Sequence, residues 1–323
     1  MTSLLPLPDP QKIDTDLLQS MRFIRDEQDD QRVEFLAGHI SKIEALTKKE
    51  VIHPLVYAYY RELTISIAAS ELEEALVCPG LDHVGLGLSG WKPIATDSYE
   101  VVTADSSDSP YSTAGFEKLL NEGTSGRLRL AAVTQEELEV SRNQIERALS
   151  LWRQFDSAGY HRWLSIIRQI VFVNVAPESE ITLGGASSLF LPGVVILSVN
   201  TDLADLEVLA SLVHESCHTH LNMLCQFEAL TLNEAGEVFV SPLRCDARPM
   251  EGIIHATYVC SEIRETMRAL SRRPPDERLA KEAAAQIEKL SSFTADGMSV
   301  ITANARLTTT GDMVVRCIRE RLS

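Results

Sequence analysis

The residues with the clearest capacity for chemistry form one short run, His214-Glu215-Ser216-Cys217-His218, which matches the pattern HExxH. Residues four apart lie on one face of an α-helix, so the imidazoles of His214 and His218 can meet a single metal ion. Glu215 stands beside the first histidine, where its carboxylate can act as general base on a metal-bound water. The spacing therefore predicts a metal site on a helix, and the alternative is two histidines that only pack or form hydrogen bonds there.

Two histidines leave a third protein ligand to be found. One metalloprotease pattern continues as xxGxxH, but the corresponding positions are Leu221 and Leu224, which excludes that class. A histidine from a neighbouring helix would leave positions open for water, substrate or cosubstrate. We favour His255, at the start of the next helical stretch, over three later glutamates in a less regular segment with an expected strand at 238–240: Glu228, Glu234 and Glu237.

Two residues near the motif receive a structural interpretation. His220 follows His218 by two residues, about 200° around a helix, and is expected on another face. Cys217 lies three residues from His214 and could approach the site, but we favour a small buried residue that packs in the core.

A second pattern consists of Arg244, Asp246 and Arg248, which alternate between Pro242 and Pro249. In an extended segment, residues two apart point the same way. Arginine presents a planar fork that binds a carboxylate with two hydrogen bonds. Near a metal, this pattern predicts a carboxylate clamp in which Asp246 orients the arginines, and the alternative is a surface ion-pair network.

A third pattern is the segment GGASSLFLPG at 184–193, which precedes a β-branched run. Its two serines, Ser187 and Ser188, are candidates to line the same pocket. A tight turn is the other interpretation of this segment.

The elements that must position these residues follow from the hydrophobic pattern. The HExxH motif lies inside an amphipathic stretch that runs to about Phe227, with Thr201-Asp202 as the expected cap. Short β-branched runs at 169–175 and 193–199 predict two buried strands before it. Helical periodicity covers three further segments: 11–77, 134–168 and the chain from Glu251 onward. Thr134 is the expected N-cap of the segment at 134–168.

These patterns predict an α+β fold that is mostly α-helical. We expect a helical N-terminal half, a small β-sheet beside the central HExxH helix, and a helical C-terminal region. Residues 79–114 are rich in Gly, Ser and Asp, with a β-like piece at 99–103, and are the best candidate for a domain boundary or loop. A helical N-terminal region at 1–114 and a metal-binding catalytic region at 115–323 are expected, unless both form one continuous domain.

Composition narrows the class of protein. The 323 residues include 30 Lys and Arg against 46 Asp and Glu, a formal net charge of −16. Such an acidic chain is expected to bind neither nucleic acid nor an anionic membrane surface. No apolar run approaches the roughly 20 residues of a membrane helix, and no signal-peptide pattern opens the chain. Six cysteines without a CxxC pair indicate reduced thiols and a cytoplasmic location.

Three segments resemble the HExxH-motif peptide-modification proteins that are encoded near ribosomally made peptide natural products. They are SSLFLPGVVILS at 187–198, LVHESCHTHLNML at 212–224 and SPLRCDARPMEGIIHATYV at 241–259. The last is the most specific, because ordinary zinc proteases lack such a block after HExxH.

The resemblance implies an iron(II)- and 2-oxoglutarate-dependent oxygenase that β-hydroxylates side chains of a precursor peptide. It gives Arg244 or Arg248 the role of binding the distal carboxylate of 2-oxoglutarate, and it implies three iron ligands: His214, His218 and His255. Two other functions stay open on the residues alone. One is a zinc-dependent peptidase or other hydrolase with Glu215 as general base, and the other is a peptide-binding module without catalysis.

Overall fold

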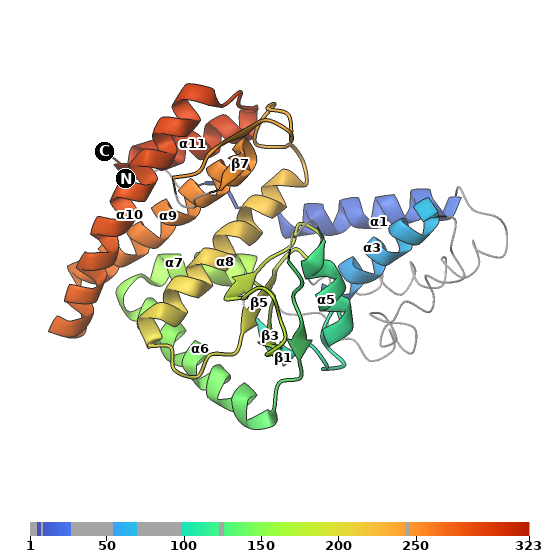
Figure 1. Ribbon diagram of the computed structural model, residues 1–323, viewed down its shortest axis with the longest axis horizontal. Coiled ribbons are helices and arrows are strands. Elements are labelled where there is room, and N and C mark those ends of the chain that lie inside the picture. Colours follow the sequence, from blue (N-terminus) through green and yellow to red (C-terminus); the bar gives the residue numbers. More distant parts are fainter. Residues whose placement is uncertain are drawn as a thin grey trace. The chain divides into compact units, whose positions relative to one another are not determined.

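The computed structural model describes residues 5–7, 9–26, 54–69, 98–122, 126–242 and 246–322 (Figure 1). The chain forms two compact units, each assembled from segments that are distant in sequence. The helical unit comprises Met1–Leu7, Gln144–Trp163 and Leu203–Ser323. The sheet unit comprises Pro8–Asn143 and Leu164–Asp202.

The sheet unit is organised around a five-stranded sheet. Its strands are β1 (Glu100–Thr103), β2 (Leu130–Ala131), β3 (Gln169–Val175), β4 (Gly185–Ala186) and β5 (Val194–Ser198). Strands β1 and β5 flank β3 and run parallel to it, whereas β2 pairs antiparallel with β3 and β4 with β5. Both long strands are buried, as continuous runs of Val and Ile require. The strands expected at 169–175 and 193–199 are confirmed.

The described residues of the sheet unit form the helices α1 (Pro10–Asp26), α3 (Pro54–Ala69), α5 (Thr113–Asn121) and the first part of α6 (Gln135–Phe155). A buried polar cluster joins α1 and α3 to the start of β3. Arg168 forms an ion pair with Asp14 at 3.4 Å, and the hydroxyl of Tyr57 donates to the same carboxylate. Gly193, at φ 82°, lies against the Arg168 side chain, where a Cβ would approach Cγ and Cδ to 2.8 Å. The turn before β5 therefore requires glycine.

The helical unit contains the rest of α6, most of α7 (Ser157–Ile166), α8 (Asp205–Cys225), α9 (Met250–Arg272), α10 (Glu277–Asn304) and α11 (Thr309–Leu322). Helix α9 is its centre, because it packs against α8, α10 and α11 (Figure 1). Ile254, Met267 and Leu270 on α9 are fully buried. A two-stranded ribbon of β6 (Val238–Val240) and β7 (Ala247–Pro249) connects α8 to α9.

The N-terminal segment is attached to the helical unit at several points. Leu5 is 2% exposed, and its carbonyl accepts a hydrogen bond from Arg162 at 2.5 Å. The carbonyl of Pro6 lies 2.9 Å from Nε2 of His220 on α8. These contacts join the N-terminal segment to residues 157 and 214 positions further along the chain.

The predicted class, α+β and mostly α-helical, is confirmed, and the strand at 238–240 and the helix from about 251 are also found. The helix expected at 134–168 is instead two helices, because Asp156 accepts a hydrogen bond from Gly159 and starts α7 anew. Thr201-Asp202 was the wrong cap. Helix α8 begins at Asp205, and the backbone N–H of Ala204 donates to Glu207 at 2.9 Å.

The expected helix at 11–77 is represented by α1 and α3, and its remaining residues lie outside the described ones. The chain passes from one unit to the other after residues 7, 143, 163 and 202, whereas the sequence suggests a division at residue 114. Among the described helices, none combines the length and apolar character needed to cross a lipid bilayer.

Candidate metal centre

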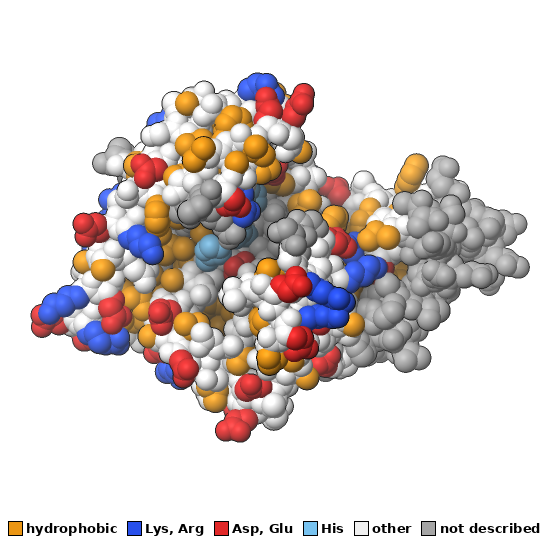
Figure 2. Space-filling model, viewed as in Figure 1, with side chains coloured by type: hydrophobic (Ala, Val, Ile, Leu, Met, Phe, Trp, Pro, Cys, Tyr) orange, Lys and Arg blue, Asp and Glu red, His pale blue; other side chains and the backbone are white. Residues whose placement is uncertain are grey.

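The HExxH motif lies in the second half of α8. Apolar residues at helical spacing, among them Leu206, Leu209 and Leu212, bury one side of this helix. His214 keeps 46% of its side chain exposed, and the face shown in Figure 2 has histidine side chains at its surface. The ring centroids of His214 and His218 lie 4.9 Å apart with their planes at 61°. Successive turns of α8 therefore place both imidazoles side by side.

His255 joins this pair from the neighbouring helix. It lies in the second turn of α9, and its ring stacks on His218 with centroids 5.5 Å apart and planes at 18°. The Nδ1 atoms of the two rings are 3.2 Å apart. Among the candidates for a third ligand, His255 is the one that the structure places against His218. The donor group found among the described residues contains His255 but neither His214 nor His218, so the structure does not bring the three histidines together in one group.

The distance between these two nitrogens fits a shared metal ion. Ligand nitrogens about 2.1 Å from one ion, at angles between octahedral and tetrahedral, are separated by about 3.0–3.4 Å. The 3.2 Å between His218 Nδ1 and His255 Nδ1 falls within this interval. Without an ion, one of the two nitrogens must carry a hydrogen and donate a hydrogen bond to the other.

Burial lowers the pKa of His255 to about 4. The imidazole is therefore neutral near pH 7 and has a lone pair to offer, which is the protonation state that a metal ligand requires.

Glu215 lies beside the first histidine of the motif. Its side chain is only 7% exposed, and its Oε1 is 3.9 Å from Nε2 of His214. The carboxylate is thus adjacent to a candidate ligand. From there it can orient that imidazole or accept a proton from a molecule bound next to it.

A further group of donor atoms, which the sequence reasoning missed, lies where α8 ends and α9 begins. In the part of the chain that the structure describes, the ligand atoms of Cys225, Glu251 and His255 all lie within 4.8 Å of one another. Burial, followed by the charge of Glu251, raises the pKa of the Cys225 thiol to about 12. One signal was present in the sequence: Glu251 precedes His255 by four residues, the same interval that relates the two HExxH histidines.

Two of the three alternative glutamates, Glu228 and Glu237, have side-chain partners elsewhere in the structure. Glu228 accepts a hydrogen bond from the backbone N–H of Thr310 at 2.8 Å. Hydrogen bonds from the side chain and the backbone of Thr310 lower the pKa of Glu228. Glu237 forms an ion pair with Arg306 at 2.9 Å and accepts a hydrogen bond from the backbone of Glu234. None of the three belongs to the donor group of Cys225, Glu251 and His255 that is found among the described residues.

His220 and Cys217 lie on the buried side of α8, 2% and 6% exposed. One nitrogen of His220 faces the carbonyl of Pro6, and the other lies 3.3 Å from the hydroxyl of Tyr258. Burial lowers the pKa of His220 to about 4. His220 is therefore a hydrogen-bonded histidine of the core, on a different face from His214.

Of the Arg244, Asp246 and Arg248 pattern, the structure describes Asp246 and Arg248. Arg248 lies in β7, and its Nε and Nη2 meet Oδ2 of Asp246 at 2.9 and 2.8 Å. Both side chains are open to solvent, at 40% and 55% exposure. Asp246 thus orients Arg248, which both the clamp and the surface ion pair predict. Arg244 lies outside the described residues.

Ser187 and Ser188 belong to the sheet unit, in the turn between β4 and β5. The hydroxyl of Ser188 accepts a hydrogen bond from the backbone of Phe190 at 3.2 Å, and its carbonyl accepts one from Leu191. These contacts are those of a tight turn. The histidine cluster lies within the helical unit, and the two serines are not part of that unit.

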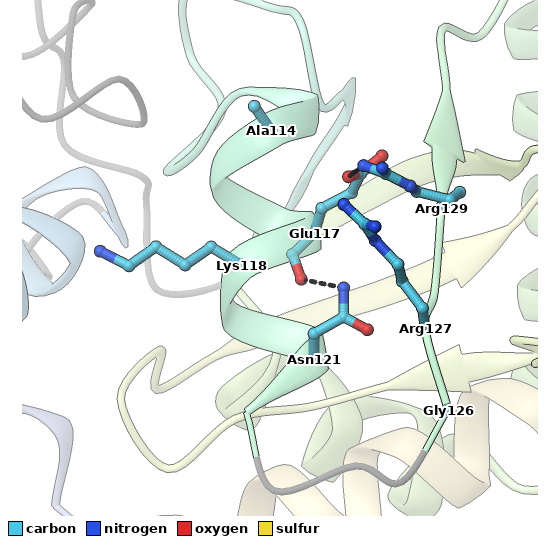
Figure 3. A pocket seen from close by; sticks show the side chains of 7 residues that line it. All are labelled: Ala114, Glu117, Lys118, Asn121, Gly126, Arg127 and Arg129. Atoms are coloured by element: carbon cyan, nitrogen blue, oxygen red, sulfur yellow. Dashed lines mark hydrogen bonds and ion pairs between the residues drawn. The ribbon is translucent and has the colours of Figure 1, made fainter.

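A cavity of about 450 Å³ lies beside α5 in the sheet unit (Figure 3). Arg127 and Arg129 point toward Glu117, which forms an ion pair with Arg129 at 3.1 Å. The same carboxylate accepts a hydrogen bond from the backbone of Leu130. None of the predicted site residues lines this cavity.

A scan against protein-family models and a search of curated proteins found no match to this chain.

Proposed function

We propose that this chain is an iron(II)- and 2-oxoglutarate-dependent oxygenase that hydroxylates a side chain of a ribosomally made precursor peptide at its β-carbon. The observation that supports this most is the 3.2 Å approach of His255 to His218 from a second helix. The resemblance of the three segments noted above supports the choice of chemistry. Among the described residues, no cysteine forms a disulfide, which supports a cytoplasmic location; these cysteines are Cys217, Cys225, Cys260 and Cys317.

His214, His218 and His255 would hold the ion. When bound, iron supplies the redox chemistry that the use of dioxygen requires. Three imidazoles as ligands would leave other positions of the ion for cosubstrates.

Arg248 is proposed to bind the distal carboxylate of 2-oxoglutarate. Asp246 engages its Nε and Nη2, and a guanidinium has five N–H donors in a fixed fork, so donors remain for a second carboxylate. Because 40% of the side chain is exposed, a small dicarboxylate can reach it.

A zinc-dependent hydrolase is the second candidate, and one specific observation favours it. The Glu215 carboxylate lies 3.9 Å from Nε2 of His214, next to a candidate ligand. In a hydrolase, this carboxylate would accept the proton of an attacking water. In the oxygenase, it would only orient His214.

Anaerobic titration of metal-free protein with iron(II) and 2-oxoglutarate tests the proposal. We expect a saturable visible charge-transfer band that His255→Ala abolishes. His161→Ala is the matched control, because this exposed histidine of α7 belongs to the same unit and has no place in the cluster, so the band should persist. Absence of the band, together with peptide cleavage that zinc restores and Glu215→Gln removes, would assign the chain to the hydrolases.

A further inference from the structure

We propose that Cys225, Glu251 and His255 form a second divalent-metal position, suited to a thiophilic ion such as Zn²⁺, which shares His255 with the proposed iron site. The three donors are a thiol, a carboxylate and an imidazole, all of intermediate exposure. They belong to the last residue of α8 and the first two turns of α9.

The distances between the three ligand atoms are close to those expected around a bound metal ion. The thiol of Cys225 donates to Oε1 of Glu251 at 3.7 Å, and all three ligand atoms lie within 4.8 Å of one another. Around a tetrahedral zinc ion, such atoms are about 3.3–3.6 Å apart. A contraction of about 1 Å, within the range of side-chain rotation, would bring the group to coordination distances.

Helical spacing explains why two positions adjoin. Cys225 follows His218 by seven residues, and Glu251 precedes His255 by four, so each pair shares one face of its helix. Since α8 and α9 pack against each other, these faces form a continuous row of donor atoms. His255 stands between the two sets, within reach of His218 on one side and of Cys225 and Glu251 on the other.

The donor set selects the kind of ion. A thiolate favours Zn²⁺ over Mg²⁺ or Ca²⁺, which prefer oxygen ligands. Once the thiol gives up its proton, the thiolate and carboxylate together carry two negative charges, which match a divalent cation. Because His255 belongs to both sets, zinc at the second position would compete with iron for this ligand. That competition rests on the proposed function, whereas the second position does not.

Titration of metal-free protein with cobalt(II), a spectroscopic substitute for zinc, tests the proposal. We expect a near-ultraviolet thiolate-to-cobalt charge-transfer band that saturates in the wild-type chain and is lost in Cys225→Ser. Cys260→Ser is the matched control, because this buried thiol of α9 is outside the donor group. Glu251→Gln, which keeps the size of the side chain, should raise the cobalt dissociation constant on the order of tenfold or more.

The same proteins separate this proposal from the proposed function. His214→Ala should keep the thiolate band and lose the iron–2-oxoglutarate band, whereas Cys225→Ser should do the reverse. A wild-type chain without a thiolate band at saturating cobalt, or a band that survives Cys225→Ser, would overturn the second position. A wild-type chain that shows the thiolate band but no iron–2-oxoglutarate band would overturn only the proposed function.

Discussion

His220 and His255 lie in the same unit, and burial lowers the pKa of each to about 4, but their nitrogens meet different partners. Those of His220 face a carbonyl and a hydroxyl, and both are used in hydrogen bonds that hold the core. Nδ1 of His255 faces another imidazole nitrogen, an arrangement that either a shared proton or a shared cation stabilises. At the scale of single residues, the group that faces a ring nitrogen distinguishes a structural histidine from a candidate metal ligand.

Replacing Arg248 tests the carboxylate clamp. We expect Arg248→Ala to weaken 2-oxoglutarate binding by about 10- to 100-fold, because charge-assisted hydrogen bonds to the distal carboxylate are lost. Metal content should stay unchanged, since Arg248 is not among the candidate ligands. Isothermal titration calorimetry of the iron(II)-loaded protein under anaerobic conditions would measure the change.

Arg278→Ala is the control for this experiment. Arg278 is also an exposed arginine of the helical unit in an ion pair, with Glu282 at 2.8 Å, and its removal should leave 2-oxoglutarate binding intact. If Arg248→Ala binds the cosubstrate as tightly as Arg278→Ala does, the Asp246–Arg248 pair is a surface ion pair and the clamp is wrong.

At the scale of elements, the periodicity of hydrophobic residues predicts most of the helices and strands that the structure describes. The strands at 169–175 and 238–240 have the expected bounds, because β-branched runs between turn residues leave few alternatives. The cap at Thr201-Asp202 was wrong, since any short polar residue near a helix start resembles a cap. The group of Cys225 with Glu251 was missed for another reason. It depends on how the end of α8 is aligned with the start of α9, which is tertiary information.

Gly297 provides a test of the packing between α9 and α10. Alanine in the middle of a helix normally stabilises it by about 0.5–1 kcal/mol relative to glycine. Here a Cβ at position 297 would approach Oγ1 of Thr257 on α9 to 2.2 Å, and Thr257 is fully buried. We therefore expect Gly297→Ala to destabilise the protein by about 1–3 kcal/mol, measured by urea unfolding.

A second substitution identifies the cause of that loss. In the double variant Gly297→Ala with Thr257→Ala, the destabilisation should be smaller than the sum of the two single effects, because the contact that causes the overlap is removed. Additive effects, or a stabilising Gly297→Ala, would show that the two helices do not approach as closely as described.

The whole molecule is organised in a way that sequence reading did not reveal. A change of composition near residue 114 suggested a boundary, but the two units are discontinuous, and the helical unit takes in residues from both ends of the chain. Composition reports local character, whereas membership of a unit depends on long-range contacts such as Leu5 with Arg162. Hydrophobic periodicity indicates local helices and strands, and it does not indicate which distant segments come into contact.

The contribution of the N-terminal segment is measured by comparing two leucines. Leu5 is 2% exposed and Leu7 is 42% exposed. We expect Leu5→Ala to reduce the stability of the helical unit by about 2–3 kcal/mol, because it leaves a cavity in the core. Leu7→Ala should have little effect.

Hydrogen exchange of α7, α8 and α11, compared between the two variants, would report the change. Faster exchange in Leu5→Ala alone is the expected result. Equal exchange in both variants would mean that the segment does not stabilise these helices.

The attachment of Pro6 to His220 has a consequence for how the chain reaches its native state. Helical proteins usually fold fast because their contacts are local, but this hydrogen bond joins residues separated by 214 positions. Closing so long a loop costs entropy before any favourable contact forms, and the cost rises only slowly with loop length. We therefore expect local helices to form before the core around Arg162 and His220 is complete. On this expectation, the surface that Leu5 covers in the native state stays open to solvent until that late step.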